Sequence, residues 1–138
     1  TRNESEDFVV FGVRACDVKS FDILDRVFLK DPVDSYYSNR RDHGIIISVA
    51  CTRPAETCFC HTFGIDPTEP AGDISVWKTD SEVFWQSNTE KGAALLEKLQ
   101  ALTEECDADI RYKDAYIRAN KEDIQIVKVL WGCLAGPL

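Results

Sequence analysis

The chain has 138 residues, of which 44% are apolar and 29% are charged, and it contains no methionine. This length and composition are typical of one globular domain that buries its own core without disulfide staples. The 24 acidic residues outnumber the 16 basic ones, and the resulting formal charge of −8 argues against a surface that binds nucleic acid. No apolar stretch approaches the ~20 residues that span a bilayer, and no signal peptide opens the chain. We therefore expect one cytoplasmic domain over residues 1–138, without membrane insertion, and we interpret the missing first methionine as the mark of a fragment.

The first quarter of the chain predicts a strand followed by a helix. Phe8 to Val13 is apolar almost throughout, which favours a strand buried on both faces. Asp17 has the side chain of a helix N-cap, and apolar residues recur after it at helical spacing as far as Leu29. Asp31-Pro32 ends this helix, because proline lacks an amide hydrogen and disfavours the helical conformation in the residue before it.

A second strand follows, and each of the two strands leads directly into a cysteine. The polar stretch Asp34 to Asp42 predicts a short helix, and Ile45 to Ala50 is the strongest buried-strand pattern in the chain. Cys16 comes shortly after the first strand and Cys51 immediately after the second. Because the carboxyl ends of parallel strands meet at the same edge of a sheet, we expect these two cysteines to converge.

The remaining elements complete an α/β pattern. Residues 61–73 are rich in glycine and proline and predict irregular chain, whereas Asp73 to Lys78 and Glu82 to Ser87 alternate apolar with polar residues, as in a hairpin or two neighbouring edge strands. Lys91 to Leu102 has the apolar stripe of an amphipathic helix, and residues 103–131 continue a helical pattern. The sequence therefore predicts a single α/β domain with a mainly parallel central sheet flanked by helices.

Four of the six cysteines are placed where one loop system can gather them. They are Cys16 and, within the segment CTRPAETCFCHTFG, Cys51, Cys58 and Cys60. A core that needs only small apolar groups can use Ala or Val, whereas thiolates are the soft ligands that zinc and iron–sulfur clusters require. This spacing indicates a metal centre, either a zinc site or a cluster.

Two other interpretations of these cysteines stay open. Three disulfides are one, but a domain of this length does not need a disulfide framework, and the spacing of Cys58 and Cys60 suits a shared metal better than bridges. Burial as small apolar side chains is the other, since free cysteine is among the most buried residue types.

The other polar residues near this segment indicate structural roles. We assign no ligand role to Cys106 or His61, and we interpret His43 as a turn residue. Arg14 and Arg53, beside two of the cysteines, can balance negative charge there or form ordinary loop salt bridges. Asp22 and Asp25 fit a solvated helix face, because nothing around them indicates the desolvation that tunes a catalytic carboxylate.

Two segments carry a resemblance to a known family. GVRACDVKSFDILDRVFL, from Gly12 to Leu29, and ISVACTRPAETCFCHTFG, from Ile47 to Gly64, resemble the beta-subunit family shared by the anaerobic sulfite reductase A subunit and the cytoplasmic sulfhydrogenases. Members of that family are iron–sulfur electron-transfer subunits that continue into a ferredoxin-like module with further cysteine motifs. Cys133 stands where the first cysteine of that module is expected, but no further cysteines follow it.

The resemblance implies a function and a cofactor. Cys16, Cys51, Cys58 and Cys60 supply the four thiolates that one [4Fe-4S] cluster needs, and air during purification can remove such a cluster from a fragment. We predict a non-catalytic domain of an electron-transfer subunit, which relays electrons to the catalytic subunit of a reductase or hydrogenase complex. The alternatives are a cofactor-free docking domain of such a subunit and a small zinc-site protein.

Overall fold

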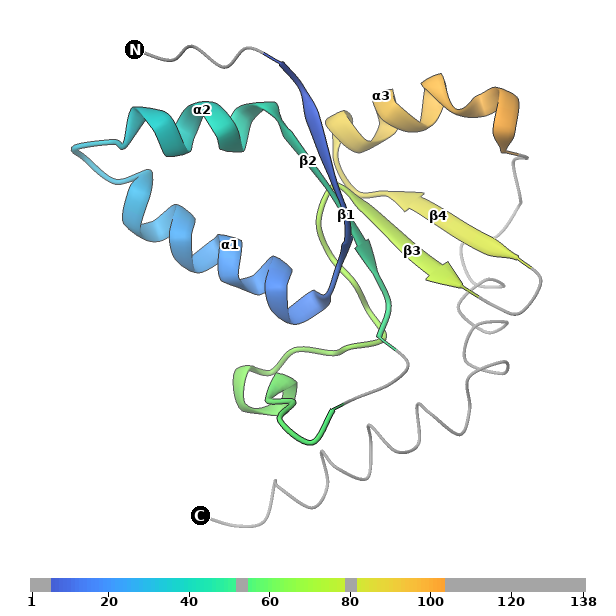
Figure 1. Ribbon diagram of the computed structural model, residues 1–138, viewed down its shortest axis with the longest axis horizontal. Helices are drawn as coiled ribbons and strands as arrows, with labels where there is room; N and C mark the ends of the chain where they lie inside the picture. Colours follow the sequence, from blue (N-terminus) through green and yellow to red (C-terminus); the bar gives the residue numbers. More distant parts are fainter. Residues whose placement is uncertain (1–5, 52–54, 79–81, 104–138) are drawn as a thin grey trace.

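The computed structural model describes residues 6–51, 55–78 and 82–103, which form a four-stranded sheet with helices on both faces (Figure 1). The strands lie in the order β1-β2-β3-β4, and the predicted α/β class with a mainly parallel sheet is confirmed. Within these residues, no helix is long and apolar enough to cross a membrane. The elements are β1 (Phe8–Val13), α1 (Ala15–Phe28), α2 (Ser35–His43), β2 (Gly44–Val49), the 3-10 helix η1 (Cys60–Phe63), β3 (Ile74–Lys78), β4 (Val83–Ser87), α3 (Glu90–Lys98) and the 3-10 helix η2 (Gln100–Leu102).

The two strands that lead into cysteines are neighbours, as the sequence predicts. β1 pairs in parallel with β2, and β2 pairs in parallel with β3, while β4 runs antiparallel to β3. The register between β1 and β2 shifts between Phe11 and Val13, where Gly12 has a φ of 86°. Glycine adopts this left-handed conformation without steric cost, so the shift marks a bulge at the end of β1.

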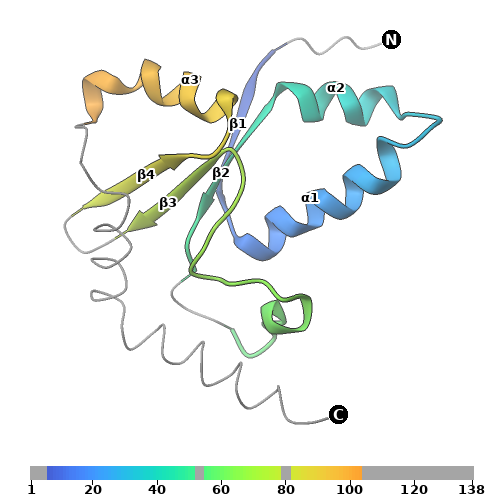
Figure 2. The ribbon, with the colours of Figure 1, turned by 180° about the vertical axis from the view of Figure 1, so that it is seen from behind.

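Successive side chains of β2 point to opposite faces of the sheet. Ile47, Ile74 and Val76 form the buried core on one face, where Leu95 and Leu96 of α3 pack against them. The opposite face carries α1 and α2, which lie together on the far side of the sheet from α3 in both views (Figures 1 and 2). The two-residue alternation of β2 therefore supplies both hydrophobic layers.

The prediction that β1 is buried on both faces is wrong. β1 is an edge strand, and Val9, Val10 and Phe11 are all exposed, with exposed fractions of 48%, 37% and 63%. A continuous apolar run is also what a fully buried strand requires, and β2 fits that description, with Ile46 and Ile47 both buried. The two apolar runs look alike in sequence, and only their order in the sheet separates them.

Three local predictions are also corrected. Helix α1 begins at Ala15 with Arg14 as its N-cap, and Asp17 is its third residue, whose carboxylate accepts from the Arg14 backbone amide at 3.4 Å. His43 is the last residue of α2 rather than a turn residue, and its Nδ1 lies 2.9 Å from Asp7 Oδ1. The sequence predicts that the last described helix reaches Leu102, but α3 ends at Lys98 and the 3-10 helix η2 follows it.

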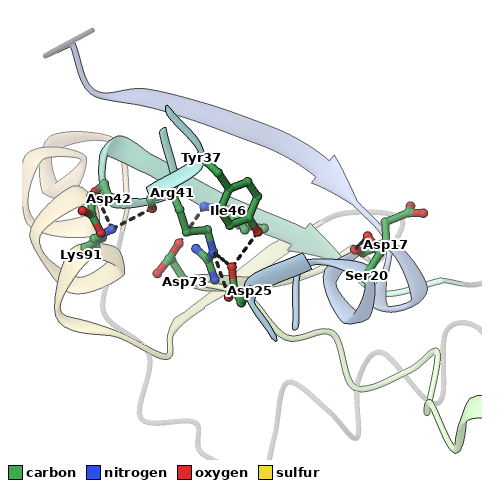
Figure 3. A network of polar contacts seen from close by, with 9 residues as sticks. All are labelled: Asp17, Ser20, Asp25, Tyr37, Arg41, Asp42, Ile46, Asp73 and Lys91. Carbon is green, nitrogen blue, oxygen red and sulfur yellow. Dashed lines mark hydrogen bonds and ion pairs between the residues drawn. The ribbon is translucent and has the colours of Figure 1, made fainter. Parts of the chain in front are cut away.

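A polar network joins α1 to α2 (Figure 3). Asp25 accepts a hydrogen bond from the Tyr37 hydroxyl at 2.6 Å and an ion-paired one from Arg41 Nε at 3.2 Å. Burial and this hydrogen bond raise the pKa of Tyr37 to about 12. Asp25 is therefore not on a solvated face as predicted, whereas Asp22 is half-exposed and pairs with Lys19 at 2.9 Å.

Asp73 fastens the start of β3 to its surroundings. Asp73 is only 8% exposed, and its carboxylate accepts hydrogen bonds from the Ile46 amide at 2.8 Å and from the Thr89 hydroxyl at 2.7 Å. Its own amide donates to the Ile46 carbonyl at 2.8 Å. Thr89 is the N-cap of α3 and accepts from the Gly92 amide at 3.2 Å. One buried carboxylate thus sets the position of β3 against β2 and of α3 against both.

Gly92 makes this arrangement testable. A β-carbon at Gly92 would overlap the backbone carbonyl of Asp73. Gly→Ala inside a helix normally stabilises it by about 1 kcal/mol, but here we expect Gly92→Ala to lower the free energy of unfolding by about 1–3 kcal/mol, because α3 must move off the sheet. Urea denaturation measures the change. Ala94→Ser, at an exposed position of the same helix, should stay within about 0.5 kcal/mol of the wild type. A stabilised Gly92→Ala variant would contradict this packing.

Candidate metal centre

Four cysteines reach one end of the sheet from three places in the chain. Cys16 lies in the first turn of α1, directly after β1. Cys51 follows the end of β2, and Cys58 and Cys60 lie in the long connection from β2 to β3, with Cys60 opening η1. Since β1 and β2 are parallel neighbours, Cys16 and Cys51 lie at the same end of the sheet, as the sequence pattern predicts.

The thiols of these residues lie near one another. The Cys60 side chain shares a hydrogen bond with that of Cys16. Negative charge on Cys16, Cys58 or Cys51 is close enough to raise the pKa of the Cys60 thiol. All four are free cysteines, so no disulfide joins them. Cys58 is exposed, whereas the other three are partly buried. The fold therefore gathers the four predicted site residues, although their role as ligands stays a prediction.

The electrostatics of the cluster favour a bound cation. Burial, together with the neighbouring charges of Cys16 and Cys58, raises the pKa of the Cys60 thiol to about 11. Four thiolates in one place repel one another unless positive charge is brought among them. Metal ions supply that charge and deprotonate the thiols that bind them. The donor set thus fits a metal centre, whose positive charge would offset the mutual repulsion of the thiolates that bind it.

Backbone contacts hold the cysteine loop in shape. The Ala55 amide donates to Cys58 Sγ at 3.1 Å, and the Cys58 amide donates in return to the Ala55 carbonyl at 3.0 Å. The Cys51 amide donates to the Pro67 carbonyl at 2.8 Å. Amide donors to sulfur are one of the means by which proteins tune iron–sulfur potentials. The Ala55 amide is a contact that sequence reasoning missed, because nothing in the side-chain pattern reports it.

Arg14 links the two turns that carry Cys16 and Cys51. Its Nη1 donates to the carbonyl of Ala50 at 3.1 Å, across the ends of β1 and β2. The partner is a backbone carbonyl rather than a carboxylate, so this contact is not the loop salt bridge that the sequence allowed for Arg14, and its charge-balancing role stays a prediction. Arg53, the other predicted arginine, lies outside the described residues, as do Cys106 and Cys133.

Two phenylalanines lie on the cysteine loop. Phe59, between Cys58 and Cys60, packs edge-on against Phe63 with ring centroids 5.7 Å apart. Each of these two residues is 55% exposed. The loop therefore presents an aromatic surface beside the four thiols, at a place where another protein can approach.

Among the residues that the structure describes, no group of three or more His, Cys, Asp or Glu side chains is close enough to hold one metal ion. A zinc ion binds all its sulfur ligands at ~2.3 Å, whereas each thiolate of a [4Fe-4S] cluster binds a different iron. Zinc and a cluster both stay candidates for the four cysteines.

Comparison with known proteins identifies a relative. A stretch of 67 residues, 49% of the chain, is 46% identical to the Sulfhydrogenase 2 subunit beta of Pyrococcus furiosus. The resemblance to the sulfhydrogenase beta-subunit family is confirmed. The aligned stretch spans 20% of that subunit, so the chain corresponds to a small part of it. No family model and no solved structure matches the chain. The likeness to the sulfite reductase A subunit stays a prediction.

The raised pKa of Cys60 predicts how the metal-free thiols react. The thiolate is the nucleophile in alkylation, and a pKa of about 11 keeps Cys60 almost fully protonated at pH 8. We expect iodoacetamide to modify the exposed Cys58 faster than Cys60 at pH 8 in the folded, metal-free chain. The rate at Cys60 should keep rising until the pH approaches 11.

Peptide mass spectrometry after timed quenching measures both rates. The urea-unfolded chain is the control, because burial and neighbouring charges are lost there and the two rates should become similar. Faster alkylation of Cys60 than of Cys58 in the folded chain would contradict the desolvated position of Cys60.

Proposed function

We propose that this chain is the cluster-binding part of an electron-transfer subunit in a sulfhydrogenase-like or anaerobic sulfite reductase-like complex. The convergence of Cys16, Cys51, Cys58 and Cys60 is the observation that carries the proposal. The likeness to a sulfhydrogenase beta subunit supports it. Four cysteine thiolates hold one [4Fe-4S] cluster, which carries one electron at a time when it is bound.

The chain's own residues determine where such a centre lies. Cys58 and Phe59 are exposed, so the centre lies close to the protein surface rather than in the hydrophobic core. Cys16 is fixed by the first turn of α1, and Cys51 by the end of β2, two rigid elements that keep their spacing. A shallow centre on a rigid frame suits a relay, because a partner subunit can approach it without a conformational change in this chain.

The proposed partners are the other subunits of the complex, one of which carries the catalytic site. The sequence has no dinucleotide fingerprint after β1. In this proposal the chain is a non-catalytic part of a cytoplasmic oxidoreductase complex. The nature of the terminal acceptor belongs to the catalytic subunit.

Substitution of single cysteines tests the ligand set. After anaerobic reconstitution with iron and sulfide, we expect the wild-type chain to hold about four irons and to absorb near 400 nm. Changing Cys16, Cys51, Cys58 or Cys60 to Ser should lower iron and sulfide content, because a hydroxyl is a harder and far less acidic ligand than a thiol. Each loss should lower the melting temperature of the reconstituted form only, since the metal stabilises the folded state that binds it.

Cys106→Ser is the matched control, because it removes a thiol to which we assign no ligand role. Its iron content should equal that of the wild type. A colourless wild-type chain with negligible iron would defeat the cluster and favour the docking domain instead. About one zinc per chain, lost on Cys58→Ser, would favour the zinc-site protein.

A further inference from the structure

The free edge of β1 lacks the protection that edge strands usually have. Among the described strands β1 pairs only with β2, so its outer backbone amides and carbonyls face away from the sheet. Natural edge strands are commonly blocked by lysine, proline or an inward-pointing charge. Phe8–Val13 contains none of these residues. The edge is therefore chemically ready to pair with another strand.

Along this edge, apolar side chains on both faces of the sheet are left exposed to solvent. On the side of α1 and α2, a cavity of about 340 Å³ is lined by Phe8 and Val10 of β1, by residues of the two helices such as Tyr36, and by Gly44 and Ile46 of β2. On the side of α3, the Phe11 ring lies 6.1 Å from the Trp85 ring yet stays largely exposed. An additional strand beside β1 would cover both surfaces at once.

We propose that the occupant is β1 of a second copy of this chain, paired antiparallel about a two-fold axis. The charges at the two ends of β1 favour this orientation. Glu6 and Asp7 precede the strand and Arg14 follows it, and all three residues are exposed. Asp7 already pairs with His43 and Arg14 Nη1 donates to the Ala50 carbonyl, so Glu6 and the remaining guanidinium nitrogens of Arg14 carry the charge contrast. An antiparallel copy brings the acidic end of each strand to the basic end of the other, whereas a parallel strand with the same ends would bring like charges together. A two-fold dimer uses the same patch on both subunits.

The pleat of the strand restricts the register of this pairing. Directly opposed residues of an antiparallel pair point to the same face of the sheet. A two-fold axis perpendicular to the sheet also keeps each residue on its own face. Val10 must therefore oppose a residue of its own parity, and the central register sets Val10 against the partner's Val10 and Val9 against the partner's Phe11. In this register, apolar side chains meet on both faces, and each Val10 lies at the mouth of the other cavity.

This dimer does not depend on the proposed function, and the intact 138-residue chain tests it. We expect sedimentation equilibrium to show a concentration-dependent dimer of twice the 15.6 kDa chain mass. Phe11→Glu and Val9→Lys should each weaken the dimer by roughly tenfold or more, because the two-fold axis applies each change twice. Val83→Lys, at a 47% exposed apolar residue on the other edge strand, is the control and should leave the dimer intact. Circular dichroism verifies that each variant is folded.

Mixing the two variants tests the register. A mixed pair of Val9→Lys and Phe11→Glu subunits sets the two new charges against each other, so the mixture should recover dimer that neither variant forms alone. A wild-type chain that stays monomeric up to submillimolar concentration would overturn the proposal, as would equal dissociation by Val83→Lys. A dimer that survives Phe11→Glu would place the interface elsewhere, and failure of the mixture to recover dimer would overturn the antiparallel register.

Discussion

The attachment of the long β2–β3 connection to the sheet is the constraint on which the other features depend. This connection carries Cys58 and Cys60 and returns to the sheet at Asp73, whose carboxylate and amide both bond to the Ile46 backbone. Side chains of the sheet satisfy the carbonyls of the returning segment: the Ser75 hydroxyl donates to Pro70 at 2.7 Å and the Trp77 indole to Thr68 at 3.0 Å. Buried polar groups without partners are costly, so these bonds specify one path for the chain.

Because the β2–β3 connection is attached to the sheet, it can hold Cys58 and Cys60 in place beside the other two cysteines. Two thiols come from rigid elements, Cys16 from α1 and Cys51 from the end of β2, and two come from the loop that is fastened at both of its ends. Arg14 closes the gap between the two strand ends through the Ala50 carbonyl. The thiols meet near the surface because the sheet ends there, while the core lies further along the strands at Ile47 and Ile74. This combination of a stiff frame and access for a partner is what the proposed relay centre would need.

β1 contributes to two separate surfaces. Its carboxyl end leads into Cys16, whereas its outer edge, which no other described strand pairs with, carries exposed apolar side chains. The bulge at Gly12 separates the two, because it ends the regular ladder before the helix begins. Pairing along Phe8 to Phe11 would therefore leave the turn at Arg14 and Cys16 in place. The proposed dimer contact and the proposed metal centre can therefore coexist on one strand.

For the described residues, the sequence by itself determined the strands, the helices and the meeting of Cys16 with Cys51, because hydrophobic periodicity is local and the ends of parallel strands share one edge. The helical pattern predicted beyond residue 103 lies outside the described residues. It also indicated the four-thiol set, since soft ligands at such spacing have few other uses. Only the tertiary structure decided that β1 is an edge strand, because an apolar run is the same in sequence whether a neighbour covers it or not. The partial burial of Asp25 and the full burial of Asp73 were likewise decided there. Their partners Tyr37, Arg41, Ile46 and Thr89 come from other elements that long-range packing brings to them.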